Sequence, residues 1–200
     1  EKTWRERIKA HFGVTIGQVT GGGIERSGGP ETPMGRFASD TVRLAVDADI
    51  GLYNPGGLRA DVVEGELTRG DLYNVFPFGN AIVRFDVSGD QLVGFLLRNA
   101  ASAHNRNHPF MQLSGLTVQW RLRAGAPELV DVQIGGEPID YGSTYSIATN
   151  SYIAGQWAYN LGFEPRDVVT HDKTIYQAAV ERAEGGVLSP PNDPRMYKVD

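Results

Sequence analysis

Residues 67–92, LTRGDLYNVFPFGNAIVRFDVSGDQL, contain the signals of a helix, a strand and a second helix in close succession. Thr68 is a favourable N-cap and predicts a short helix over residues 68–75. Residues 81–87 alternate between apolar and polar side chains, which is the period of a strand. Ser88 then predicts the start of a helix that continues to residue 100. Helices and strands therefore lie close together in this chain.

The rest of the chain continues this mixture of elements. Further strands are predicted at residues 14–20, 49–53, 116–122, 130–134, 145–149 and 196–199, and further helices at 34–47 and 174–182. Because helices and strands interleave without a regular strand–helix repeat, the fold class is predicted to be α+β, a single mixed α/β domain. A length of 200 residues fits one large domain with a sizeable core.

The first residues have the pattern of an amphipathic helix. Trp4, Ile8 and Phe12 recur at a spacing of four in EKTWRERIKAHF. A sequence that opens within such a helix suggests a part of the protein upstream of it. We therefore expect residues 1–12 to be the end of an interdomain linker helix and residues 13–200 to form the domain.

Composition narrows the possible functions. The formal net charge is −5, so no overall basic field would attract nucleic acid or an anionic membrane. The chain has no cysteine and therefore neither disulfides nor thiolate metal ligands. No apolar run reaches the roughly 18 residues that a membrane helix needs. We expect no nucleic-acid partner and no membrane span, and any anion site must be local.

Residues 54–59, NPGGLR, follow the strand predicted at residues 49–53. Gly56 and Gly57 allow the backbone to pass close to a ligand, and Arg59 supplies a bidentate cation suited to phosphate or carboxylate. The pattern indicates a small anion site. A tight turn followed by a solvated arginine has the same sequence, and both interpretations stay open.

Residues 75–80, VFPFGN, connect the first helix to the strand of the segment quoted above. Phe78, between a proline and a glycine, is placed to offer its ring face to a planar ligand such as a nucleobase, with Asn80 as a polar neighbour. A core phenylalanine in a helix-to-strand connection is the alternative. Residues 149–159, TNSYIAGQWAY, add Tyr152 and Trp157 but indicate little by themselves.

The histidines do not form a recognisable metal site. His11, His104, His108 and His171 occur in no HxH, DxH or HExxH pattern. His104 and His108 are the pair closest in sequence, and a solvated polar loop explains them more simply. A two-metal hydrolase needs a cluster of His, Asp and Asn ligands. We therefore predict no catalytic residue and no metal ligand in this chain.

Four segments together carry a family resemblance. They are residues 54–59, residues 67–92, FMQLSGLTVQW at residues 110–120, and GEPIDYGSTYSIATNSYIAG at residues 136–155. In this order and at these spacings they resemble the C-terminal domain of the 5'-nucleotidase family, which includes bacterial UDP-sugar hydrolases and animal ecto-5'-nucleotidase. The resemblance covers the chain from about residue 33 to residue 200.

The resemblance implies a site that holds phosphate. The family's glycine-rich loop is matched by Asn54, Gly56, Gly57 and Arg59, and Pro55 replaces one glycine of that loop. A further arginine of the family precedes the first helix of the domain. The nearest candidates for this possible phosphate contact are Arg26 and Arg36.

The resemblance also implies a site for the base. Phe78 and Tyr152 match the two rings that sandwich the base, and Asn80 matches a polar residue beside it. The family commonly has an aspartate that holds the ribose hydroxyls, and Ala158 occupies that position here. Trp157 is a candidate to fill the sugar pocket instead.

The function implied is that of one half of an enzyme. The domain would recognise a nucleotide or nucleotide sugar, and an N-terminal metallophosphatase domain in cis would hold two divalent metal ions. The full-length protein is expected to be a phosphoric ester hydrolase located in the periplasm, in the cell wall or outside the cell, and this chain alone to be inactive. The alternative is a non-enzymatic binding module for a nucleoside, a sugar or a protein partner.

Overall fold

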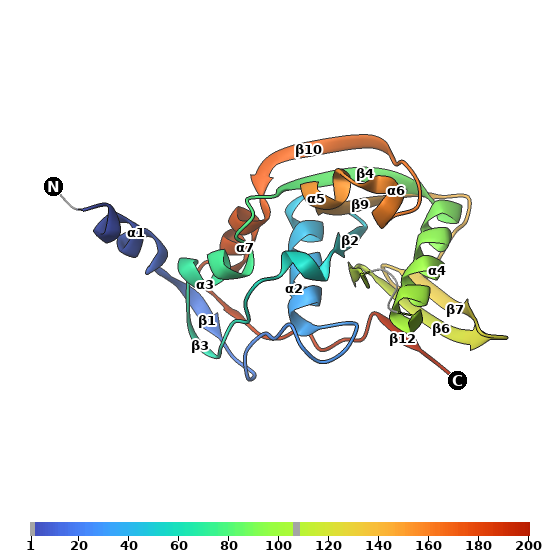
Figure 1. Cartoon of the computed structure of the whole chain (residues 1–200), viewed down its shortest axis with the longest axis horizontal. Coiled ribbons are helices and arrows are strands. Elements are labelled where there is room, and N and C mark those ends of the chain that lie inside the picture. The colour runs from blue at the N-terminus through green and yellow to red at the C-terminus, as the bar shows by residue number, and fades with distance from the viewer. Residues whose placement is uncertain (1–2, 106–108) are drawn as a thin grey trace.

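The central feature of the fold is a five-stranded mixed sheet (Figure 1). The computed structural model describes residues 3–105 and 109–200. The order of the sheet is β10 (Arg166–Thr174), β4 (Ala81–Ser88), β9 (Thr144–Asn150), β2 (Ile50–Tyr53) and β5 (Gln112–Ser114). Only the β2–β9 pair of this sheet is parallel, with Gly51 opposite Ala148. The mixed α/β fold class predicted from the sequence is confirmed.

A smaller sheet and four helices lie on the side of the molecule where the N-terminus is found (Figure 1). The sheet has the order β11 (Gly186–Leu188), β1 (Thr15–Val19) and β3 (Gly65–Thr68). Helix α3 (Arg69–Val75) follows β3, and α7 (Ile175–Ala183) follows β10. Helix α1 (Trp4–Phe12) projects from this side, and α2 (Pro33–Ala45) runs between the small sheet and the central one (Figure 1).

The third sheet lies on the other side of the central sheet. Its order is β12 (Met196–Lys198), β6 (Leu116–Arg123), β7 (Ala126–Ile134) and β8 (Glu137–Pro138). Helix α4 (Gly89–Asn105) packs against β7 and β4. Two short helices, α5 (Ser151–Ala154) and α6 (Trp157–Asn160), follow β9, and the 3₁₀ turn η1 (Pro55–Gly57) follows β2. No helix of the described residues combines the length and the apolarity that crossing a membrane requires.

Two apolar clusters fill the space on either side of the central sheet. Tyr53, Ile82 and Ala148 belong to the cluster that includes α2, α3 and α7. Leu52 and Phe85 belong to the cluster that includes α4 and β6. Neighbouring strand residues contribute to different clusters because successive side chains point to opposite faces of a sheet. The central sheet is therefore covered on both faces.

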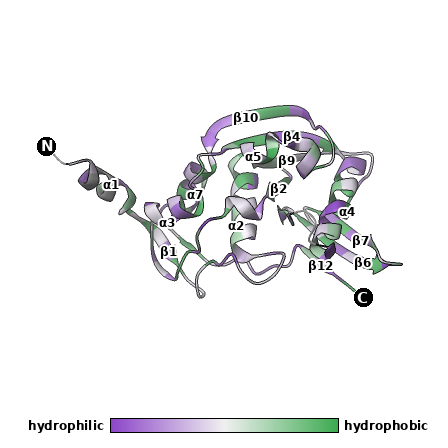
Figure 2. Cartoon of the chain, in the orientation of Figure 1, coloured by the Kyte–Doolittle hydropathy of each residue, from purple (hydrophilic) through white to green (hydrophobic). Residues whose placement is uncertain are grey.

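Local sequence signals explain where two of the helices begin. Thr68 caps α3, where its Oγ1 accepts a hydrogen bond from the Asp71 amide at 3.2 Å, as predicted. Thr174 caps α7 in the same way. Strands β3 and β10 were not predicted from the sequence. In β10 the polar and charged residues outnumber the two valines, and Figure 2 shows both purple and green along this strand. The apolar alternation of a half-buried strand is therefore missing.

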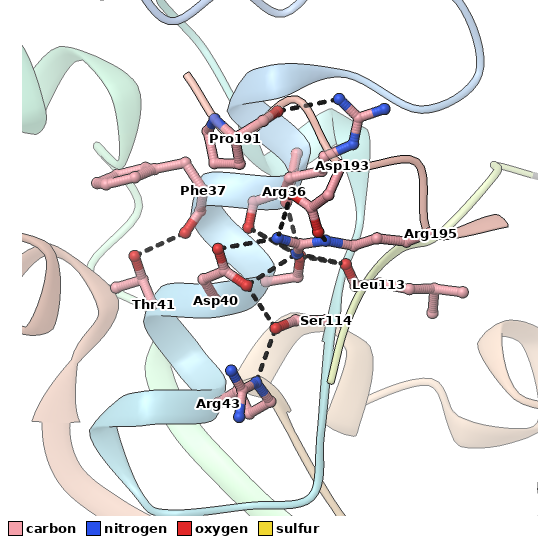
Figure 3. A network of polar contacts seen from close by, with 12 residues as sticks. Arg36, Phe37, Asp40, Thr41, Arg43, Leu113, Ser114, Pro191, Asp193 and Arg195 are labelled. Atoms are coloured by element: carbon pink, nitrogen blue, oxygen red, sulfur yellow. Dashed lines mark hydrogen bonds and ion pairs between the residues drawn. The ribbon is translucent and has the colours of Figure 1, made fainter. Parts of the chain in front are cut away.

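A buried ion pair ties the C-terminal segment to α2 (Figure 3). Arg195 donates to Asp40 from Nη1 at 2.8 Å and from Nη2 at 3.0 Å. Its Nη1 also donates to the carbonyl oxygen of Leu113 at 2.8 Å, and its Nε pairs with Asp193 at 3.0 Å. Burial opposes the charge on Arg195, but the hydrogen bonds to Asp40 and Asp193 raise its pKa above the ordinary value. Helix α2, strand β5 and the C-terminal segment are thereby joined.

Asp40 has further partners in the same network. The Ser114 hydroxyl donates to Asp40 Oδ1 and accepts a hydrogen bond from Arg43 Nε at 2.8 Å. Arg182 of α7 lies 3.5 Å from Asp40 Oδ2 and holds its guanidinium carbon 4.6 Å from the centre of the Phe37 ring. Because several elements share one carboxylate, loss of a single partner affects all of them.

We predict that Arg195→Met lowers the free energy of unfolding by about 3–5 kcal/mol, because it leaves the Asp40 carboxylate buried without its main partner. Urea denaturation measures this change. The matched control is Lys173→Met, which removes the exposed Lys173–Glu181 pair and is expected to cost less than about 1 kcal/mol. Equal losses in the two variants would contradict a structural role for the buried pair.

Candidate functional site

The candidate site forms where the parallel strands β2 and β9 end. Both strands point the same way, so the residues that follow them emerge at one edge of the central sheet. Asn54 follows β2 and begins the NPGGLR loop, and Asn150 ends β9 and begins α5. In open α/β sheets this edge, beyond the carboxyl ends of the strands, is where ligands bind.

Two buried asparagines join the two segments. Asn150 Nδ2 donates to Asn54 Oδ1 at 2.8 Å, and Asn150 Oδ1 accepts from the Ile153 amide at 3.0 Å. The same side chain therefore caps α5 and anchors the NPGGLR loop. Sequence reasoning missed Asn150, although an asparagine between a strand and a helix is a recognisable N-cap signal.

The glycine turn packs on a buried tyrosine. The Gly57 amide donates to the Asn54 carbonyl at 3.1 Å, which closes the turn. A Cβ at Gly57 would lie 2.9 Å from Cε1 of Tyr53, so only glycine fits there, whereas Gly56 is exposed and has room. Burial raises the pKa of the Tyr53 phenol well above its usual value, against the opposing effect of its hydrogen bond to Asn150. Tyr53 therefore stays neutral and supports the turn from below.

Phe78 is presented to solvent by the turn between α3 and β4. Its exposed fraction is 58%, whereas Phe76, two residues earlier, is buried at 4%. Phe76 is thus the core phenylalanine of this connection, and the interpretation of Phe78 as a core residue is wrong. Gly79 has a φ of 62°, a left-handed conformation that favours glycine and turns the chain after Phe78.

Arg59 lies next to Phe78. Its guanidinium carbon is 5.9 Å from the centre of the Phe78 ring, within the range of a cation–π contact. The Arg59 amide donates to the Val75 carbonyl at 3.1 Å, which holds the loop against the end of α3. The Arg59 side chain is exposed, and its hydrogen bond from Nη1 to the Gly56 carbonyl is long at 3.5 Å. Its donors are therefore available to an anion.

Asn80 connects the Phe78 turn to the start of α5. The Ser151 hydroxyl donates to Asn80 Oδ1 at 3.4 Å, and the Asn80 carbonyl accepts from the Ile175 amide at 3.0 Å. Tyr152, the residue after Ser151, exposes 51% of its surface. The structure thus places Phe78, Asn80 and Tyr152 in neighbouring segments, with Arg59 beside Phe78.

The two other arginines differ in position. Arg26 Nη1 donates to the Leu58 carbonyl at 3.3 Å, adjacent to Arg59, while its Nε pairs with Asp61 at 3.1 Å. Arg36 pairs with the largely buried Glu31 at 2.8 Å and donates to the Pro191 carbonyl at 3.0 Å. Arg26 therefore borders the NPGGLR loop. Arg36 is instead held by Glu31 and Pro191, which lie away from that loop in the sequence.

The segment after Tyr152 packs partly into the core. The Trp157 ring meets the Phe85 ring edge-on, with centroids 4.9 Å apart. The ring thus packs against the apolar cluster that includes α4 and β6, while part of Trp157 stays exposed. Whether Trp157 also fills a sugar pocket stays a hypothesis. Gln156 and Ala158 are exposed on either side of it.

The histidine pair considered as a metal site lies only partly within the described residues. His104 is exposed at the end of α4, and His108 lies outside the described residues. Within residues 3–105 and 109–200, no group of three or more His, Cys, Asp or Glu side chains is arranged to hold a metal ion.

An α/β domain with two exposed rings, amide side chains and an arginine at the carboxyl ends of its parallel strands has the form of a ligand-binding domain. The family model described as "5'-nucleotidase, C-terminal domain" matches residues 13–160. This chain belongs to that family, whose enzymes are hydrolases, and the resemblance seen in the sequence is confirmed.

Curated relatives also match most of this chain. Protein UshA of Salmonella pullorum is 32% identical over 154 residues, which cover 76% of this chain and 27% of that protein. The NAD 5'-nucleotidase of Haemophilus influenzae is 30% identical over 174 residues, or 77% of this chain and 29% of that protein. Endonuclease YhcR of Bacillus subtilis is 31% identical, but only 10% of its length is covered. The chain thus spans less than a third of each of these relatives.

A solved structure supports the fold independently. The 5'-nucleotidase precursor from Thermus thermophilus superposes with a TM-score of 0.81 at 23% identity. The match covers 98% of this chain and 41% of that one. Nearly the whole of this chain therefore corresponds to one part of a larger molecule of known fold.

We predict that Asn150→Ala lowers the free energy of unfolding by about 2–4 kcal/mol, because it removes a helix cap and leaves Asn54 without a buried partner. Chemical denaturation monitored by circular dichroism measures the loss. The control is Ser88→Ala, which removes the exposed cap of α4 and is expected to cost about 0.5–1 kcal/mol. If Asn150→Ala costs no more than Ser88→Ala, the asparagine pair does not hold the two segments together.

Proposed function

We propose that this chain is the substrate-recognition domain of a metal-dependent 5'-nucleotidase-type phosphoric ester hydrolase, and that its ligand is a nucleotide or a nucleotide sugar. The observation that carries the proposal is the exposure of two aromatic rings, Phe78 and Tyr152, in segments joined through Asn80 and Ser151. Solvent exposure of a large ring forgoes the gain from burying it. A nucleobase stacked on such a ring recovers about 1–3 kcal/mol.

Arg59 is proposed to hold the phosphate. Its guanidinium carbon is 5.9 Å from the centre of the Phe78 ring, so one nucleotide is long enough to contact both groups. Arg26, beside Leu58, is the second candidate cation. Arg36 stays a weaker candidate because Glu31 already neutralises it. Asn54, Gly56 and Gly57 supply the turn that positions Arg59.

The sugar is proposed to be held loosely. Ala158 is exposed and offers no carboxylate to the ribose hydroxyls, and charge-assisted hydrogen bonds of that kind contribute about 1.5–3 kcal/mol. Ribose and 2'-deoxyribose ligands should therefore bind within a few fold of each other. The exposed amide of Gln156 is the nearest group that could restore a preference for ribose.

Hydrolysis is proposed to need a second domain in cis, an N-terminal metallophosphatase domain, whose divalent metal ions would supply an activated water. This chain would orient the nucleotide toward that domain. Relatives named NAD 5'-nucleotidase and Endonuclease YhcR are consistent with phosphoester substrates. From the family resemblance alone, we propose that the full-length protein hydrolyses nucleotides in the periplasm, in the cell wall or outside the cell.

We predict that Phe78→Ala or Tyr152→Ala weakens nucleoside binding by about tenfold or more, since each removes one stacking surface. Titration of each variant with adenosine and uridine by NMR measures the affinity. Tyr141→Ala, which removes another exposed ring, is the matched control and should bind like the wild type. Binding that is unchanged in both ring variants would place the nucleoside elsewhere.

We predict that the 200-residue chain does not release phosphate from AMP, UDP-glucose or a chromogenic phosphate ester, even with added manganese, zinc or cobalt. A colorimetric phosphate assay measures this. Joined to a metallophosphatase domain, the same chain should support turnover. Metal-dependent turnover by the isolated chain, lost in His104→Ala, would contradict the proposed division of labour. Nucleoside binding without turnover in the full-length protein would favour a non-enzymatic binding module.

A further inference from the structure

The guanidinium of Arg59 lies over the ring of Phe78 and not in an ion pair. Its central carbon is 5.9 Å from the ring centre, within the range of a cation–π contact. Within the part of the chain that the structure describes, the remaining hydrogen bond of this side chain is the long one, 3.5 Å, from Nη1 to the Gly56 carbonyl. Arg26 and Arg36, by contrast, are each paired with a carboxylate. The Arg59 side chain is therefore held weakly and can be displaced.

The main chain keeps the guanidinium and the ring close to each other. The Arg59 amide donates to the Val75 carbonyl at 3.1 Å. Val75 is the last residue of α3, and the turn that carries Phe78 follows it directly. Rotation about the side-chain bonds of an exposed arginine is fast and needs no shift of the backbone. The guanidinium can therefore leave the ring while the loop stays in place.

The side of Phe78 on which Arg59 lies is also the side that a base shared with Tyr152 would use. The other side of the ring lines a cavity of about 620 Å³ against α3 and α7, whose wall includes Tyr73 and Tyr176. Neither Arg59 nor Tyr152 lines that cavity. A base held between Phe78 and Tyr152 therefore lies outside the cavity, where Arg59 is found.

A base and the guanidinium compete for this face of the ring. A stacked base lies at van der Waals distance, about 3.5–4 Å from the ring, which is nearer than the 5.9 Å of the Arg59 guanidinium carbon. The base must therefore displace Arg59. A nucleoside offers nothing to the displaced cation, whereas the phosphate of a nucleotide offers it charge-assisted hydrogen bonds.

We propose that Arg59 covers the base-binding face of Phe78 in the free protein and that a phosphate group draws it away, so that Arg59 selects nucleotides over nucleosides. The inference rests on the proposed nucleotide-binding function. An exposed cation–π contact of this kind should lower nucleoside affinity by about two- to fivefold. One residue thus strengthens the binding of one class of ligand and weakens that of the other.

The test is an NMR titration of the whole chain with adenosine and with AMP. Arg59→Ala uncovers the ring and removes the cation, so it should bind adenosine about two- to fivefold more tightly than the wild type. The same variant should bind AMP about tenfold or more weakly. The matched control is Arg123→Ala, which removes an exposed arginine paired with Glu128 and should change neither affinity. Damage to the fold would weaken both ligands and not shift them in opposite directions.

The contact itself can be measured without a nucleotide. Protons above an aromatic ring resonate upfield, so the Hδ protons of Arg59 should move downfield in Phe78→Leu. Inorganic phosphate should move them in the same direction in the wild type, because it draws the guanidinium off the ring. Sodium chloride at the same ionic strength should leave them in place.

Two results would overturn the inference and leave the proposed function standing. One is unchanged or weaker adenosine binding in Arg59→Ala, together with weakened binding in Phe78→Ala. The other is an Arg59 Hδ signal that does not respond to Phe78→Leu. Failure of the proposed function looks different: adenosine and AMP bind Phe78→Ala and Tyr152→Ala as they bind the wild type, or neither ligand binds any variant. In that case the inference fails with it.

Discussion

The bidentate contact between Asp40 and Arg195 is the constraint on which the rest of the arrangement depends. It fixes α2 against β5 and the C-terminal segment. Helix α2 in turn lies so close to β2 that a Cβ on Gly51 would overlap the Ser39 carbonyl. Since β2 ends at the NPGGLR loop, a displaced helix would move that loop. A buried pair of this kind adds little net stability, and it is better understood as fixing one arrangement among several.

Hydrogen bonds of asparagine side chains hold the segments of the candidate site together. Asn54 and Asn150 join the segments that leave the parallel strands, and Asn80 joins the Phe78 turn to the start of α5. The Asn150 amide both donates to Asn54 and accepts from Ile153, so one residue satisfies two elements at once. Phe78 in its turn and Tyr152 in α5 are therefore both anchored to the ends of the strands, which is how a surface site keeps its geometry before a ligand arrives.

Signals among neighbouring residues predicted much of the fold and of the candidate site. Contacts between residues far apart in the sequence could not be predicted. The Thr68 cap, the alternation in residues 81–87 and the glycine turn each depend on a few neighbouring residues. Which of Phe76 and Phe78 is buried depends instead on how the turn meets the core. The Asp40–Arg195 contact joins residues 155 positions apart. The contact of Asn150 with Asn54 and the packing of Trp157 on Phe85 likewise appear only when β9 is placed beside β2 and β4.

Strand β10 has a consequence for association between molecules. It forms one edge of the central sheet, and its exposed Val168 and Val169 make it an attractive template for a strand of another copy. Charged residues flank the valines, and its register with β4 shifts twice. Charges and irregular pairing both disfavour the addition of a further strand. The polar composition of β10 prevented its prediction from the sequence. The same composition disfavours aggregation through this edge of the sheet.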